Sequence, residues 1–360
     1  MAFRLTDRAA ERARALVRAK YHPFRSAETD RFVEHFRGTF GPSVRAIIFY
    51  GSCLSKVTRS ADSMYDFFII CDSYDRFYAG AKGAFWKKRR PWVHAGINRF
   101  LPPNIYEADI EAGEALGGGT MAAKYCVVDW RDLKRETSLR ANDLYHLGRF
   151  SKRMGVAFTA TERELDALID RFVETSTTVG GMALGRLAAR PDPGAPFTAR
   201  DFVIACLSLS YEGESRVEAP DKVEKLFRSE EAFYEELYGE TILPGLTDDG
   251  GPLAAARADG SFELALTPAD RARLARDVDH ALVRSRRRGK QRWPKLMFLY
   301  EDWITYILDK IERTTGQRFE VTETQRRFWP ILGWKTFFEI RRAGLIKSLG
   351  GGGEGGNGAG

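Results

Sequence analysis

The alternation of apolar and polar residues predicts an α/β core in the first third of the chain. Residues 44–50 and 65–71 are short runs rich in β-branched and aromatic residues, which is typical of buried strands. Residues 122–128 form a third run of this kind. Helical patterns flank these strands at residues 7–20, 29–37 and 74–101, the last interrupted by Pro91. We therefore expect a parallel or mixed sheet with helices packed on it, over about residues 40–135.

The pattern becomes mostly helical after about residue 136. Apolar residues recur at helical spacing in 144–154, 161–175, 199–210, a basic stretch at 268–290, and 294–313. Residues 191–194 and 245–260 are rich in turn-forming residues and are expected to be loops. We expect an α/β (α+β) domain with N-terminal helices (1–135) and a mostly helical domain that completes a cleft, with a winged helix as one form it can take (136–245). A basic helical C-terminal region (246–349) and a flexible tail (350–360, with eight glycines) complete the chain.

Composition favours a folded protein with an anionic partner. Hydrophobic residues make up 44% of the 360 residues and charged residues 29%, so a packed core is feasible. The net charge of +7 points to a nucleotide, a phospholipid or a nucleic acid without choosing among them. No run of 18 apolar residues exists, so no transmembrane helix is expected. Four cysteines lack metal-binding spacing and are expected to be core thiols in a reducing compartment: Cys53, Cys71, Cys126 and Cys206.

The most informative stretch is Gly51-Ser52 at the end of the first strand, followed by Asp66 on the second. A glycine lets a phosphate approach the backbone closely, and Ser52 lies where the next helix would start, so its hydroxyl and free N–H groups can hold a triphosphate. Lys56 and Arg59 add positive charge nearby in sequence. Asp66, flanked by aromatic residues, would hold Mg²⁺ against those phosphates. A simple turn at Gly-Ser and a solvent-facing aspartate at a strand edge remain the alternatives.

This arrangement resembles the polymerase-β-like nucleotidyltransferase fold, whose usual pattern has two carboxylates where this chain has Met64 and Asp66. Ordered motifs over residues 49–223 resemble more closely the mitochondrial-translocator-maintenance type of phosphatidate cytidylyltransferase, a peripheral CDP-diacylglycerol synthase. The motifs are Tyr50-Gly51-Ser52 with Asp66, Lys124-Tyr125-Cys126-Val127, residues 144–152 (Leu-Tyr-His-Leu-Gly-Arg-Phe-Ser-Lys), residues 209–216 (Leu-Ser-Tyr-Glu-Gly-Glu-Ser-Arg) and residues 220–223 (Pro-Asp-Lys-Val).

The chain also departs from the family pattern. Cys126 replaces a glycine, Glu214 replaces an aspartate, and the family's His-Tyr-Ser segment has no clear counterpart near residues 75–101. The resemblance fades beyond about residue 245. These departures fit a distant, bacterial member of the family and weaken the inference about its lipid.

The resemblance implies a reaction and a set of site residues. CTP and phosphatidate would react, with Mg²⁺, to give CDP-diacylglycerol and pyrophosphate in phospholipid biosynthesis. Asp66 and Lys124 would be catalytic, with Asp66 holding the metal ion, and Arg149 and Lys152, three residues apart on one helix, would bind phosphatidate. The nucleotide would be bound by Gly51, Ser52, Lys56, Arg59, Tyr211, Glu214 and Arg216.

Several of these assignments have a structural alternative. Lys124 could be a solvated edge lysine, and Arg149 with Lys152 could be a salt-bridged helix surface. The residues around Gly213 could be a helix cap with an ion pair. Asp129 could supply a second metal ligand or cap the helix that starts near Trp130.

Phosphatidate lies in a bilayer, so we expect the protein in the cytoplasm, peripherally bound to the inner face of the membrane. Residues 326–342 mix aromatic and basic residues as interfacial anchors do, and residues 284–290 add positive charge facing an anionic membrane surface. A core-packed terminal helix and a solvated loop are the alternatives. Nucleic acid is not expected as a partner, and the sequence leaves the oligomeric state open. A nucleotidyltransferase acting on a soluble or nucleic-acid acceptor and a catalytically inactive nucleotide-binding module are the alternative functions.

Overall fold

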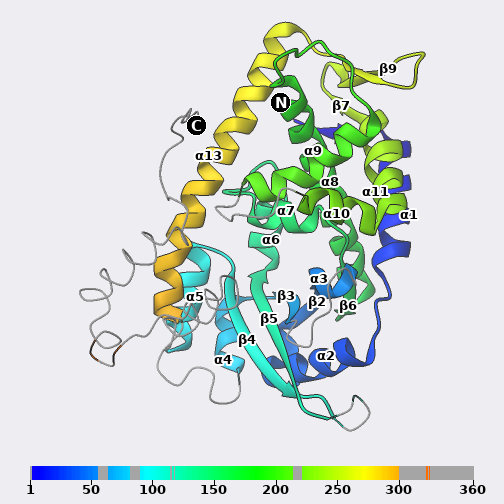
Figure 1. Cartoon of the computed structure of the whole chain (residues 1–360). Coiled ribbons are helices and arrows are strands. Elements are labelled where there is room, and N and C mark those ends of the chain that lie inside the picture. Colours follow the sequence, from blue (N-terminus) through cyan, green and yellow to red (C-terminus); the bar gives the residue numbers. More distant parts are fainter. Residues whose placement is uncertain are drawn as a thin grey trace, which may run out of the picture. The chain divides into compact units, whose positions relative to one another are not determined.

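A five-stranded mixed sheet organises the computed structural model (Figure 1). The structure describes residues 2–55, 64–81, 90–113, 116, 118–213, 221–299, 322 and 324. The chain divides into two units, Met1–Arg288 and Gly289–Gly360, and the architecture below is that of the first. The strand order is β4-β5-β3-β2-β6, in which only β3 and β5 are parallel. The strands are β2 (Val44–Tyr50), β3 (Tyr65–Cys71), β4 (Asn104–Glu111), β5 (Thr120–Asp129) and β6 (Gly155–Thr159).

The sheet confirms the α/β prediction and extends it. β2 and β3 have the predicted bounds, and β5 includes the predicted run at 122–128. β4 was not predicted, because acidic residues on its outer positions hide the alternation of an edge strand. β6, also unpredicted, brings residues 155–159 back to the sheet from beyond the proposed domain boundary at 135. The winged-helix form of the second domain stays a prediction.

One face of the sheet packs against α2 (Ala27–Phe40) and α4 (Tyr74–Gly80). Phe32 and Phe36 lie 5.2 and 5.5 Å from Phe67, measured between ring centroids, and Phe40 stacks on Phe77 at 4.2 Å. Rings at these separations form favourable aromatic pairs. This aromatic layer therefore fixes which side of β3 faces the two helices.

The opposite face packs against the helical half of the chain. Phe68 contacts Phe150 at 5.1 Å between ring centroids, and Phe150 stacks on Phe172 at 5.3 Å. The helices of this half are α6 (Trp130–Glu136), α7 (Tyr145–Phe150), α8 (Glu162–Ala188), α9 (Ala199–Glu212), α10 (Lys222–Ser229), α11 (Glu231–Tyr234), the π-helix η4 (Glu235–Ile242) and α12 (Leu243–Gly245).

The remaining elements complete the first unit and lead out of it. α1 (Asp7–Tyr21) packs on α8, and α5 (Pro91–Phe100) packs on α4. Pro91 is the first residue of α5, so the predicted helix over 74–101 is two helices. Short strands occupy part of the predicted 245–260 loop. The basic helix α13 continues past its predicted end at residue 290 and ends at residue 299. These elements are β1 (Arg4–Leu5), 3₁₀-helix η1 (Gly41–Ser43), α3 (Ser52–Ser55), β7 (Leu246–Asp248), β8 (Gly251–Pro252), β9 (Ala254–Ala256), β10 (Phe262–Leu264) and α13 (Pro268–Leu299).

The close approach of α7 and α9 generates a stability prediction. A Cβ atom on Gly148 would lie 2.7 Å from the backbone Cα atom of Ser210, so Gly148→Ala forces the two helices apart. We expect the free energy of unfolding to fall by about 1–3 kcal/mol. Gly38, exposed in α2 with nothing within 4 Å of an added Cβ, is the matched control, and Gly38→Ala should stabilise by up to about 1 kcal/mol. Urea unfolding measures both; equal effects would contradict the packing described.

Candidate active site at one end of the sheet

Four side chains lie in one row across the sheet. Tyr50 of β2 is in register with Asp66 of β3, Asp66 with Lys124 of β5, and Lys124 with Glu107 of β4. Residues in register on neighbouring strands point to the same face. This is the face of Phe68 and Cys126, which lie two residues further along and pack against the helical half. The sequence placed Lys124 beside Asp66, and the register confirms that placement.

Gly51 makes room for the Asp66 carboxylate. A Cβ atom on Gly51 would lie 2.5 Å from Asp66 Oδ2, and the backbone of Gly51 has a φ of +90°. Both features favour glycine over any other residue here. α3 begins at Ser52, as predicted. Lys56 and Arg59, placed here by sequence, lie outside the residues that the structure describes.

A chain of polar contacts runs from the row into the helical half. The Tyr50 hydroxyl lies 3.5 Å from Cys126 Sγ, which lies 3.2 Å from the Tyr145 hydroxyl of α7. Burial raises the pKa of Tyr50 well above its usual value, and the charge of Asp66 raises it further while Arg149 lowers it. Burial likewise raises the pKa of the Cys126 thiol. Asp66 and Arg149 therefore act electrostatically on the same buried groups, although they are 83 positions apart in sequence (149 minus 66).

Cationic side chains close to these polar contacts lie over two tyrosine rings. The Arg149 guanidinium carbon lies 3.6 Å from the centre of the Tyr145 ring, and its Nη1 donates to the Tyr145 carbonyl at 3.0 Å. Lys152 Nζ lies 4.0 Å from the centre of the Tyr211 ring, and Lys222 Nζ lies 5.5 Å from the same ring. Such cation–π contacts hold each cation over a defined surface.

The structure corrects one detail of this group. α7 ends at Phe150, so Lys152 lies beyond the helix and does not share a helix face with Arg149 as predicted. The two cations instead meet different rings. Glu214 and Arg216, which the sequence grouped with Tyr211, lie outside the described part of the chain. Gly213 ends α9, as the predicted turn requires.

The helices that carry these rings are tied together by α13. The Ser285 hydroxyl donates to the Gly213 carbonyl at 2.7 Å and accepts from the Leu144 N–H at 3.0 Å. Arg288 Nε donates to Asp143 Oδ2 at 3.2 Å. One buried serine on α13 therefore connects the residue before Tyr145 to the end of the helix that carries Tyr211.

Asp129 caps a helix and does not join Asp66. Its Oδ1 accepts from the Asp132 N–H at 2.7 Å, at the start of α6. Asp129 is in register with Cys71, five residues along β3 from Asp66, which is roughly 16 Å at the rise of a strand. Partial burial raises the pKa of the Asp129 carboxyl, and the Asp132 N–H opposes that shift. Of the two sequence-based alternatives, the structure supports the cap.

The Asp66 carboxylate could bind a metal ion whose other ligands do not come from the protein. No group of three or more His, Cys, Asp or Glu side chains gathers within the described ranges. Mg²⁺ characteristically uses one or two protein carboxylates together with substrate phosphates and water. Asp66 supplies one such carboxylate beside Gly51, where a side chain would fill the space next to Oδ2. One carboxylate fits Mg²⁺ only where the other ligands are water or phosphate oxygens.

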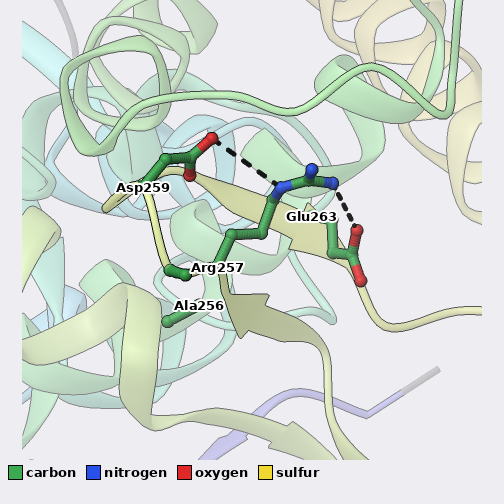
Figure 2. Close-up of a pocket in the computed structure, with 5 residues that line it drawn as sticks. Ala256, Arg257, Asp259 and Glu263 are labelled. Atoms are coloured by element: carbon green, nitrogen blue, oxygen red, sulfur yellow. Dashed lines mark hydrogen bonds and ion pairs between the residues drawn. The ribbon is translucent and has the colours of Figure 1, made fainter.

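A pocket lies elsewhere, at the β9–β10 hairpin (Figure 2). Arg257 pairs with Glu263 at 3.0 Å and with Asp259 at 4.0 Å, and each of the three side chains is roughly half exposed. Exposed pairs of this kind contribute little energy. With its only basic side chain already paired with two carboxylates, this pocket offers no chemistry comparable to that of the sheet end.

Two membrane expectations have different outcomes. Within the described residues, none of the helices combines the length and apolar character needed to cross a bilayer. Residues 326–342, the predicted interfacial anchor, lie outside the residues that the structure describes.

Sequence reasoning missed Tyr50, Glu107 and Tyr145. Tyr50 and Tyr145 belong to motifs quoted above, but their hydroxyls meet only through Cys126 on a third element. Glu107 lies 3.7 Å from Lys124 Nζ on the unpredicted strand β4. The tyrosine within each motif is the signal that could have identified the first two.

Comparisons with known proteins establish no family. No protein-family model and no curated protein matches the chain. A solved structure, a nucleotidyltransferase-like protein from Exiguobacterium sibiricum 255-15, is 14% identical with a TM-score of 0.21. The match covers 88% of this chain and 91% of that one. At so low a TM-score the similarity carries no argument about fold or function.

The Ser285 connection generates a prediction for the site's scaffold. Ser285→Ala leaves the Leu144 N–H and the Gly213 carbonyl without this partner, so we expect about 1–3 kcal/mol less free energy of unfolding. Thr177→Val is the matched control, because the buried Thr177 hydroxyl bonds only the Val173 carbonyl of its own helix. Urea unfolding should show a smaller loss for the control, about 0.5 kcal/mol. A loss as large in Thr177→Val would refute the special role of Ser285.

Proposed function

We propose that this protein is a Mg²⁺-dependent nucleotidyltransferase that converts CTP and phosphatidate to CDP-diacylglycerol and pyrophosphate. The observation that carries the proposal is the position of Asp66, against the backbone of Gly51 and in register with Lys124. A carboxylate, a glycine without side-chain bulk and an ammonium group at one sheet end are what a magnesium-bound triphosphate requires.

In this proposal Gly51 and Ser52 hold the β- and γ-phosphates, and Asp66 holds the metal ion. Mg²⁺, when bound, would supply positive charge that stabilises the negative charge developing on the phosphates. Asp66 is partly exposed to solvent. Lys56, Arg59, Tyr211, Glu214 and Arg216 are proposed to complete the nucleotide site.

Lys124 and Arg149 supply positive charge on the two sides of the reacting phosphorus. Lys124 stabilises the transferring α-phosphoryl group, and its Nζ lies 3.7 Å from Glu107 Oε1 of the neighbouring strand β4. Arg149, stacked on Tyr145, and Lys152, beside Tyr211, bind the phosphate of the acceptor. That phosphate is ionised at neutral pH, so it attacks the α-phosphorus in line with little need for a general base.

The choice of CTP and phosphatidate depends on the motif resemblance over residues 49–223, whereas the choice of nucleotidyl transfer depends on the site. A soluble or nucleic-acid acceptor would preserve the roles of Gly51, Asp66 and Lys124. A catalytically inactive module would preserve only nucleotide binding. The basic residues 284–290 support the soluble or nucleic-acid acceptor. Within them Arg284 and Arg288 bond the loop before α7, whereas Arg286 and Arg287 are exposed.

Replacing the proposed metal ligand tests the assignment. Asp66→Asn keeps the side-chain shape beside Gly51 and removes the charge, so pyrophosphate release from CTP with Mg²⁺ and phosphatidate vesicles should fall about 100-fold or more. Asp109→Asn, an exposed carboxylate on the same face of β4, is the matched control and should retain full rate. Full activity of Asp66→Asn with unchanged Mg²⁺ dependence would exclude the assignment.

Arg149→Lys tests the acceptor side. Lysine keeps the charge but loses the planar fork that binds two phosphate oxygens and stacks on Tyr145, so KM for phosphatidate should rise roughly tenfold. KM for CTP should change little. Arg153→Lys is the control, because Arg153 is paired with Glu230. A rise in the KM for CTP alone would place Arg149 in the nucleotide site instead.

A further inference from the structure

α5 presents an aromatic face to solvent. Trp92 and Phe100 are 68% and 82% exposed. Among the described residues the only other exposed large hydrophobic side chain is that of Leu139, at 45%. Isolated exposed apolar residues are ordinary on protein surfaces. Here two large exposed aromatic residues share one ten-residue helix, about 12 Å apart along its axis. Exposed apolar surface concentrated in this way marks sites of interaction.

Helix geometry places these side chains on one side of α5. At about 100° per residue, Trp92, Gly96, Arg99 and Phe100 fall within an arc of about 100°. Each of the four is exposed. The buried residues His94, Ala95 and Asn98 occupy the opposite side. α5 is therefore amphipathic in an unusual sense, since its outer side carries the larger aromatic residues.

The buried side of α5 is fixed by a polar network, so the aromatic face is not free to turn inward. Asn98 Nδ2 donates to the Tyr78 hydroxyl at 2.9 Å and to the Val127 carbonyl at 3.0 Å, and Asn98 Oδ1 accepts from the Asn104 N–H at 2.7 Å. His94 Nδ1 lies 2.9 Å from the Tyr106 hydroxyl. Breaking buried hydrogen bonds is costly, so Trp92 and Phe100 stay outside.

Basic residues accompany the aromatic face. Arg90 directly precedes the helix and is exposed, and Arg99, in its last turn, pairs with Asp75 of α4. In sequence, residues 87–90 are four consecutive bases (Lys-Lys-Arg-Arg). Tryptophan and phenylalanine beside arginine is the composition of surfaces that lie at the headgroup level of anionic membranes.

We propose that Arg90, Trp92, Gly96 and Phe100, here called the α5 face, dock the protein on an anionic lipid bilayer. We choose a bilayer over another acidic partner because of the proposed lipid substrate. The exposure of the α5 face does not depend on that proposal. Two aromatic side chains of about 150–250 Å² each provide too little area for a stable protein interface, which needs about 800 Å² per partner. A membrane accepts such small insertions because lipid charge adds to the attraction.

Vesicle sedimentation of the full chain tests the α5 face without CTP or phosphatidate. The protein should sediment with phosphatidylcholine vesicles that contain phosphatidylglycerol and not with pure phosphatidylcholine. The double variant Trp92→Ser/Phe100→Ser should bind roughly tenfold or more weakly. Leu139→Ser, which removes the third exposed apolar side chain, should bind within twofold of the unmodified protein. Because all three positions are exposed, the thermal unfolding temperature should not change.

Three results would overturn the proposal. The unmodified chain could fail to bind anionic vesicles, the double variant could bind as well as Leu139→Ser, or the double variant could instead abolish a concentration-dependent dimer seen by light scattering. Turnover on detergent-dispersed phosphatidate is measured separately with the unmodified chain. Absent turnover with intact vesicle binding would remove the proposed reaction and leave the α5 face in place.

Discussion

The register of β2, β3 and β5 is the constraint on which the rest of the site depends. It sets Tyr50, Asp66 and Lys124 side by side and brings Gly51 against the Asp66 carboxylate. A slip of one residue would turn Asp66 to the opposite face, toward α2 and α4. That slip is prevented because both faces of β3 are packed, with Phe67 against α2 and Phe68 against Phe150. Core packing therefore places the carboxylate.

The helical half adds positive charge to that of Lys124 at the sheet end. Arg149 and Lys152 come from either side of the end of α7, and Tyr145 and Tyr211 give them defined surfaces. α7 reaches α9 closely enough only because Gly148 has no side chain. Thus Gly148, directly before Arg149 in α7, contributes to the spacing of the cations, and the scaffold and the site cannot be varied independently.

The sequence predicted local features well and long-range contacts poorly. β2 and β3 were predicted with their bounds because both are continuous apolar runs that end in polar or turn residues. β4 was missed because an edge strand carries acids at alternate positions. The placement of Lys124 beside Asp66 followed from the motifs. The contacts from Tyr50 through Cys126 to Tyr145 join residues 95 positions apart (145 minus 50), which no local pattern encodes. For Asp129 the sequence allowed two roles, a helix cap or a second metal ligand. The strand register places Asp129 away from Asp66, and its hydrogen bond to the Asp132 N–H is that of a cap.

The most direct test of the central claim is pyrophosphate release with each of the four nucleoside triphosphates and Mg²⁺, with and without phosphatidate vesicles. The account predicts release with CTP, and only when phosphatidate is present. Equal release without lipid would keep the triphosphate site at Gly51 and Asp66 but contradict the lipid acceptor. No release under any condition would contradict catalysis at this site altogether.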